Sequence, residues 1–129
     1  MDQDWIDSLI GARLVDLDNT GFTVMSTNRN GSKEFRFDFD EDAGDCCGFN
    51  TIESTFLWDG EGDAPAIVKV EYLKDFSKDG NGCTITFFGE SSEIGKVSTY
   101  SSSGSGWCYG ACVTVKCREN NDKALLSYW

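Results

Sequence analysis

Hydrophobic and polar residues alternate along much of this chain, and a period of two is typical of β-strands with one buried face. The clearest case begins at Glu34, where Phe35, Phe37 and Phe39 alternate with charged residues. We expect these phenylalanines to belong to the core and the charged residues between them to face outward. A second alternating stretch covers 107–117 and places six side chains on one face: Trp107, Tyr109, Ala111, Val113, Val115 and Cys117.

The remaining pattern predicts one short helix and further strands joined by tight turns. Apolar residues at positions 5, 6, 9 and 10 have helical spacing, and Gly11 is expected to end a helix over 2–10. The stretch 49–58 fits a helix or a strand, and we favour a strand. Clusters of Asn, Asp and Gly at 28–31 and 79–82 predict turns. The other expected strands cover 13–18, 21–27, 67–73, 83–88, 97–102 and 124–129.

These elements predict a mainly β fold with one short N-terminal helix. An antiparallel meander or a sandwich-like sheet fits the pattern, and an α+β fold is the alternative. The length of 129 residues fits a single domain over 1–129, which is long enough to bury a substantial core. The aromatic content of 13% argues against a disordered acidic tail.

The net charge of −11 is confined to the first half of the chain. Residues 1–65 contain fifteen Asp or Glu and four Lys or Arg, whereas residues 66–129 contain seven of each class. An acidic surface repels nucleic-acid phosphates and anionic membranes, and it attracts basic proteins. We therefore expect a protein partner with a basic surface, and no direct contact with nucleic acid or membrane. A surface that serves solubility alone is the simpler alternative.

The N-terminus carries no pattern of a secretory signal, because acidic residues at positions 2, 4 and 7 stand where a basic region would be. No apolar stretch approaches the roughly 20 residues that span a bilayer. We therefore expect a cytoplasmic location. There the six cysteines would remain mostly reduced rather than form disulfides.

The chain has no histidine, which excludes Ser-His-Asp and Cys-His catalysis. Neither a G-x-S-x-G elbow nor a G-x-x-x-x-G-K-[ST] phosphate loop occurs. Paired carboxylates of the glycosidase kind remain open, because acidic residues are so numerous. An enzyme is accordingly our third choice, and no catalytic residue is assigned.

Two metal sites are considered from the spacing of ligand-type residues. Asp38, Asp40 and Asp42 resemble the start of a calcium loop, but its sixth and twelfth places hold Ala43 and Phe49 instead of Gly and an acid. We favour a solvated strand face and expect no cofactor. Zinc is the alternative for the cysteines, although the C-x2-C spacing is missing. The thiolates that it would use are Cys46, Cys47, Cys108 and Cys112, with Cys117 as a further option.

Several short motifs together resemble a known family. They are Leu9-Ile10-Gly11, the Phe-rich strand, Asp45-Cys46-Cys47 and Phe88-Gly89-Glu90-Ser91. The chain is similar over 9–117 to a small bacteriophage domain of unknown function that carries an Asp-Cys-Cys motif. That family has a histidine before the motif and an acidic residue after it, whereas this chain has no histidine and continues with Gly48. The resemblance implies a phage origin and a place in the host cytoplasm, without an established activity.

Two functional hypotheses follow. The first is a non-enzymatic acidic phage protein that binds a host protein and inhibits or redirects it, in host takeover or anti-defence, with a surface that mimics nucleic acid as one form. Its expected contact residues are Asp38, Asp40, Glu41, Asp42 and Asp45, joined by Asp59, Glu61 and Asp63. The second is a protein that sequesters a small ligand, which for an anionic signal would need basic residues around a pocket. The candidates for that role are Lys69, Lys96, Lys116 and Arg118.

Overall fold

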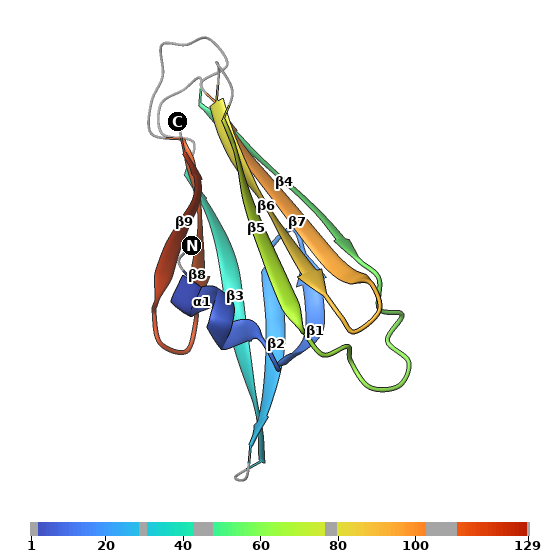
Figure 1. Cartoon of the computed structure of the whole chain (residues 1–129). Coiled ribbons are helices and arrows are strands. Elements are labelled where there is room, and N and C mark those ends of the chain that lie inside the picture. Colours follow the sequence, from blue (N-terminus) through green and yellow to red (C-terminus); the bar gives the residue numbers. More distant parts are fainter. Residues whose placement is uncertain (1–2, 29–30, 43–47, 77–79, 103–110, 129) are drawn as a thin grey trace.

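The computed structural model describes residues 3–28, 31–42, 48–76, 80–102 and 111–128 (Figure 1). Within these residues one short helix precedes nine strands, as the hydrophobic pattern predicts. The helix is α1 (Gln3–Leu9), and the first strands are β1 (Arg13–Asp18), β2 (Gly21–Asn28), β3 (Gly31–Asp42) and β4 (Phe49–Phe56). The remaining strands are β5 (Lys69–Phe76), β6 (Gly80–Phe88), β7 (Glu93–Ser102), β8 (Cys112–Cys117) and β9 (Lys123–Tyr128).

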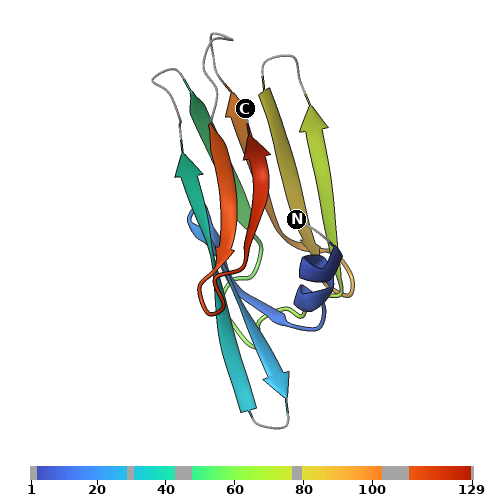
Figure 2. The same cartoon turned by 90° about the vertical axis from the view of Figure 1, so that its left-hand side faces the viewer.

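The strands form two antiparallel sheets, which Figures 1 and 2 show as two layers. The five-stranded sheet has the order β1-β2-β3-β8-β9, and the four-stranded sheet has the order β4-β7-β6-β5. This arrangement confirms the mainly β, sandwich-like fold with an N-terminal helix. It also confirms a strand rather than a helix after Phe49, since β4 pairs with β7 along its whole length.

Aromatic rings fill the space between the sheets. Phe22 is completely buried and stacks on Phe37 with ring centroids 4.7 Å apart. Its ring also lies 5.2 Å from that of Phe87, which belongs to the opposite sheet. Phe37 and Phe39 are buried, and Phe35 is partly buried against the same cluster. The expected phenylalanine face of β3 is therefore confirmed, with Phe35 at its margin.

Several strand boundaries differ from the sequence prediction; β7, for example, begins at Glu93 rather than at position 97. Of the glycine-rich stretch that predicts a turn at 79–82, residues 80–82 are instead part of β6, which begins at Gly80, and residue 79 lies outside the described residues. Its glycines fit a strand because Tyr100 of β7 lies against them: a Cβ on Gly80 would come within 2.7 Å of the Tyr100 hydroxyl oxygen. The strand predicted to begin at position 67 begins instead at Lys69 and continues to Phe76. Of the alternating stretch 107–117, residues 107–110 lie outside the described residues, and β8 covers the rest from Cys112.

A buried row of hydroxyl groups joins β9 to the four-stranded sheet. The Thr99 hydroxyl donates to Ser127 Oγ at 3.1 Å, and the Ser101 and Ser127 hydroxyl oxygens are 2.8 Å apart. The Ser101 hydroxyl also donates to Asn50 Oδ1. Because buried polar groups without partners are costly, this row favours one alignment of the last strand over others that are equally hydrophobic.

Candidate protein-binding face

The outward side of the five-stranded sheet carries most of the described acidic strand residues. Strand pairing places Asp18, Gly21, Asp38 and Lys116 side by side across four strands. Two residues away along each strand, on the same side of the sheet, Asp16 lies opposite Thr23, and Thr23 lies opposite Arg36. The inward-facing phenylalanines of β3 fix this arrangement, because neighbouring strand residues point to opposite sides.

Arg36 is the centre of an ion-pair network on this face. Its side chain is only 19% exposed, and its guanidinium lies 3.2 Å from the Asp38 carboxylate and 3.7 Å from that of Asp16. It also donates hydrogen bonds to the hydroxyls of Thr20 and Thr23. A partly buried guanidinium with this many acceptors stabilises the charged strands around it.

Asp38 is paired more strongly than the sequence suggests. Besides Arg36, it accepts two hydrogen bonds from Arg118, at 3.0 Å from Nε and 2.9 Å from Nη2. Burial raises the pKa of Asp38, but the hydrogen bonds from Arg118 and Arg36 outweigh this effect, and the net pKa is lowered. Asp38 lies on the outward side of the sheet as expected, but two arginines already pair with it. Its partner Arg118 comes from the second half of the chain, which β3–β8 pairing brings alongside.

Asp40, Glu41 and Asp42 end β3, and we name these three residues the β3 acidic end. All three are exposed, and their cross-strand neighbours in β8 are uncharged. Within the described part of the chain, no salt bridge involves Asp40 or Glu41. Asp45, the next expected contact residue, lies outside the described residues. Asp40 and Glu41 therefore carry negative charge that the network around Arg36 does not neutralise.

The other expected acidic residues lie elsewhere. Asp59, Glu61 and Asp63 are exposed in the loop that follows β4, where the Glu61 backbone amide donates to Asp59 Oδ1. The Asn50 side chain at the start of β4 donates to the backbone oxygen of Asp42, so the β3 acidic end lies at the near end of this strand. β4 has eight residues, which corresponds to roughly 25 Å at the usual rise of a strand. The two acidic clusters thus lie at opposite ends of β4 and do not form one patch (Figure 1).

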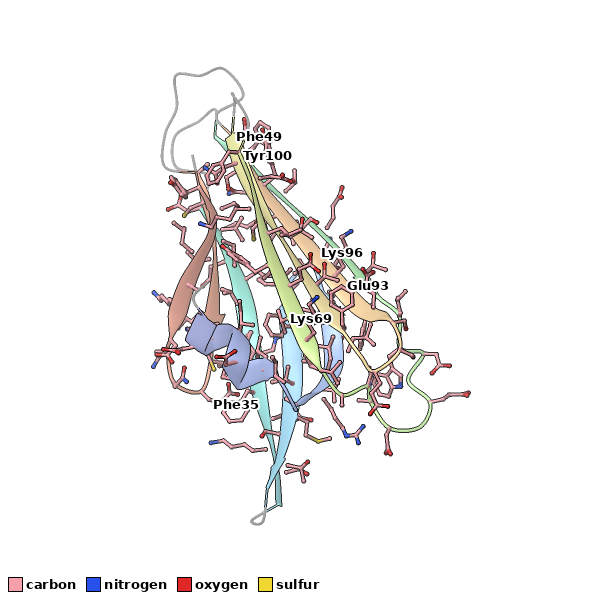
Figure 3. All side chains as sticks on the ribbon, viewed as in Figure 1. Phe35, Phe49, Lys69, Glu93, Lys96 and Tyr100 are labelled. Atoms are coloured by element: carbon pink, nitrogen blue, oxygen red, sulfur yellow. The ribbon has the colours of Figure 1, made fainter. Side chains whose placement is uncertain are left out.

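The four basic candidates for an anion pocket do not converge. Lys116 and Arg118 border a hollow of about 480 Å³ on the outward side of the five-stranded sheet, but Asp38 and Asp40 border it too. Lys69 and Lys96 lie on the four-stranded sheet instead (Figure 3). A hollow with both signs of charge, whose arginine is already paired, does not favour a small anion.

A second cavity, of about 360 Å³, lies between α1, β2, β3 and the β8–β9 turn. Trp5 and Leu9 of the helix line it together with Phe35 and Phe37, and Asp4 and Asp122 lie at its border. The sequence pattern did not predict this cavity. Four separate segments line it, and nothing in the sequence indicates that these segments lie next to one another.

The cysteines that the structure describes do not come together. Cys83 and Cys117 are buried free thiols on different sheets, and Cys112 lies on β8 with the opposite orientation to Cys117. Burial raises the pKa of both Cys83 and Cys117, which makes them poor nucleophiles. Among the described residues no group of three metal-ligand side chains occurs. Three of the proposed zinc ligands, Cys46, Cys47 and Cys108, lie outside those residues.

The protein therefore belongs to the class of antiparallel two-sheet β proteins, and the end of its strand β3 is acidic. Comparison with known protein families, curated proteins and solved structures finds no match for this chain. The described part of the chain contains no helix that is long and apolar enough to cross a membrane.

Replacing Asp38 with asparagine is expected to lower the free energy of unfolding by about 1 kcal/mol at pH 7, since exposed ion pairs contribute up to this amount. The lowered pKa of Asp38 means that its contribution is present above the unfolded-state pKa and is lost as the pH falls through the folded-state value. The difference between wild type and variant should therefore shrink below about pH 4.

Urea denaturation at a series of pH values measures this difference. Asp40→Asn is the matched control, because Asp40 lies on the same strand and face but forms no salt bridge in the described structure. The role assigned to Asp38 fails if Asp38→Asn has no larger effect than the control at pH 7.

Proposed function

We propose that this chain is a non-enzymatic binding protein whose β3 acidic end contacts a basic surface on a partner protein. The observation that supports this most directly is the contrast along one strand. Asp38 is held by two arginines, whereas Asp40 and Glu41, two and three residues further along the strand, are exposed and form no salt bridge in the described structure.

The electrostatic free energy of the folded state suggests that the β3 acidic end has a function in binding. Like charges next to one another raise the electrostatic free energy of the folded state, and interspersed lysines would relieve it. Lys116 on β8 lies opposite Asp38, whereas the β8 residues opposite Asp40 and Glu41 are Thr114 and Val113, which carry no charge. A basic partner would supply the missing charge and would be steered to this end of the strand.

The resemblance to a small phage domain suggests the kind of partner. A phage protein of this size and charge would bind a protein of the bacterial host in the host cytoplasm and inhibit or redirect it. A partner that normally binds nucleic acid is one candidate, since its basic surface would accept a row of carboxylates in place of phosphates. The Asp-Cys-Cys motif and the acidic first half of the chain are what support this assignment.

The test compares two variants that remove equal charge. In the first, Asp40→Asn, Glu41→Gln and Asp42→Asn neutralise the β3 acidic end. In the second, Asp59→Asn, Glu61→Gln and Asp63→Asn neutralise the loop after β4. A partner captured from host lysate by the wild type is purified, and its affinity for each variant is measured at low and high salt.

We expect the first variant to lose at least about tenfold in affinity at low salt, with a weaker dependence on salt. The control variant should keep most of the affinity, because only its net charge changes. Equal losses of affinity in both variants would mean that binding depends on the net charge of the protein and not on the β3 acidic end, which would contradict the proposal. Unchanged affinity of the first variant at both salt concentrations would contradict the proposal.

A further inference from the structure

The edge strand β5 carries a concentration of exposed hydrophobic side chains. Phe76 is 73% exposed, Leu73 is 58% exposed, and Val68 just before the strand is 45% exposed. Among the described strands only β6 pairs with β5, so the edge of β5 that faces away from β6 has no described strand beside it. A long edge strand with apolar side chains is a site for pairing with a further strand.

The other three sheet edges each have a feature that hinders such pairing. β1 is interrupted by a bulge between Leu14 and Asp16, and the Leu14 amide donates to the Pro65 carbonyl oxygen. The pairing of β9 with β8 also contains a bulge, and the Tyr128 amide donates to Asn81 of the opposite sheet. β4 is joined to the five-stranded sheet through hydrogen bonds of Asn50 and Ser54. By contrast, β5 pairs with β6 without any irregularity.

Among the registers centred on the middle of β5, at Glu71, Tyr72 or Leu73, the charges favour one way to pair it with a second copy of itself. In a symmetric antiparallel pair of β5 strands, residues directly opposite each other point to the same side of the joint sheet. The outer faces of both sheets therefore lie on one side only if the two-fold axis passes through a residue that faces its own copy, and we call this residue the centre. Centring on Glu71 places two Glu71 carboxylates opposite each other, and centring on Leu73 places Glu71 opposite Asp75 of the second copy. Centring on Tyr72 avoids both repulsions and places Lys69 opposite Asp75 of the second copy, twice by symmetry.

The same centre also brings the exposed hydrophobic side chains together. It places Val68 opposite Phe76 of the second copy, again twice, and makes the two Leu73 side chains diagonal neighbours. Lys69 is already held on the outer face, where its ammonium lies 5.4 Å from the centre of the Phe88 ring. This position, visible for Lys69 in Figure 3, is where the carboxylate of Asp75 from the second copy would arrive.

We propose that β5 is a self-association edge, through which two copies of this chain join their four-stranded sheets into one continuous antiparallel sheet of eight strands. The contact is isologous, so it closes at two copies. It involves neither the β3 acidic end nor the acidic residues of the loop after β4, and it is independent of the proposed function.

A charge-swap cycle tests both the association and its register. Sedimentation across a dilution series is measured for the wild type, Lys69→Asp, Asp75→Lys and the double variant that carries both changes. Lys96→Asp is the matched control, because it makes the same charge change at an exposed position of the inner strand β7. Circular dichroism checks that each variant is folded.

We expect the wild type to dimerise and each single variant at 69 or 75 to weaken dimerisation roughly tenfold, since each pair of like charges occurs twice. The double variant should regain most of the affinity, and Lys96→Asp should match the wild type. A wild type that is monomeric at every concentration overturns the proposal. So does a double variant that is no better than the single variants, or a control that weakens dimerisation equally.

Discussion

Replacing Phe22 with alanine is expected to lower the free energy of unfolding by about 3–5 kcal/mol, the usual range for a buried phenylalanine. Phe22 is completely buried, and its ring contacts Phe37 and Phe39 from β3 and Phe87 from the opposite sheet. Removal of the ring leaves a cavity between the two sheets, which antiparallel strands with fixed register cannot easily close. Urea denaturation followed by tryptophan fluorescence measures the change.

Phe49→Ala provides the control of the same chemistry at an exposed site. Phe49 is 43% exposed at the start of β4, and its loss should lower the stability by less than about 1 kcal/mol. Similar effects of the two substitutions would mean that the aromatic cluster around Phe22 does not join the sheets.

Replacing Gly21 with alanine is expected to lower the free energy of unfolding by about 3 kcal/mol or more, through strain and collision together. Gly21 has a φ of +151°, which side-chain-bearing residues rarely adopt. A Cβ at this position would also overlap the backbone carbonyl oxygen of Phe37 on β3. Either the β2–β3 pairing or the stacking of Phe22 on Phe37 would have to change.

Gly31→Ala separates the two contributions. Gly31 begins β3 with a φ of +112°, but a Cβ there would meet nothing within 4 Å. Its replacement should therefore show conformational strain alone, about 1–3 kcal/mol. Denaturation of both variants under the same conditions gives the difference. If Gly31→Ala is as destabilising as Gly21→Ala, the collision with Phe37 contributes nothing.

The sequence by itself determined the elements and their faces. Phe37 and Phe39 alternate with charged residues, and a strand can bury only one of its two sides. The same rule predicted the buried positions Val113 and Val115 of β8, which the structure confirms. Gly11, predicted to end the helix, follows it with a φ of +92°. These features depend on the local spacing of residues and on backbone geometry, and both can be inferred from neighbouring positions in the sequence.

Only the tertiary structure decided which charges meet. Residues 1–65 contain only four bases, but β3–β8 pairing brings Arg118 to Asp38 from 80 residues away in the sequence. The sequence also predicts a single acidic patch, whereas β4 separates the β3 acidic end from the loop after β4. The spacing of charged residues along the sequence does not indicate which of them will pair, because ion pairs form wherever the strand order brings opposite charges together. The same holds for the free edge of β5, because whether a strand is central or at an edge depends on sheet order rather than on its own residues.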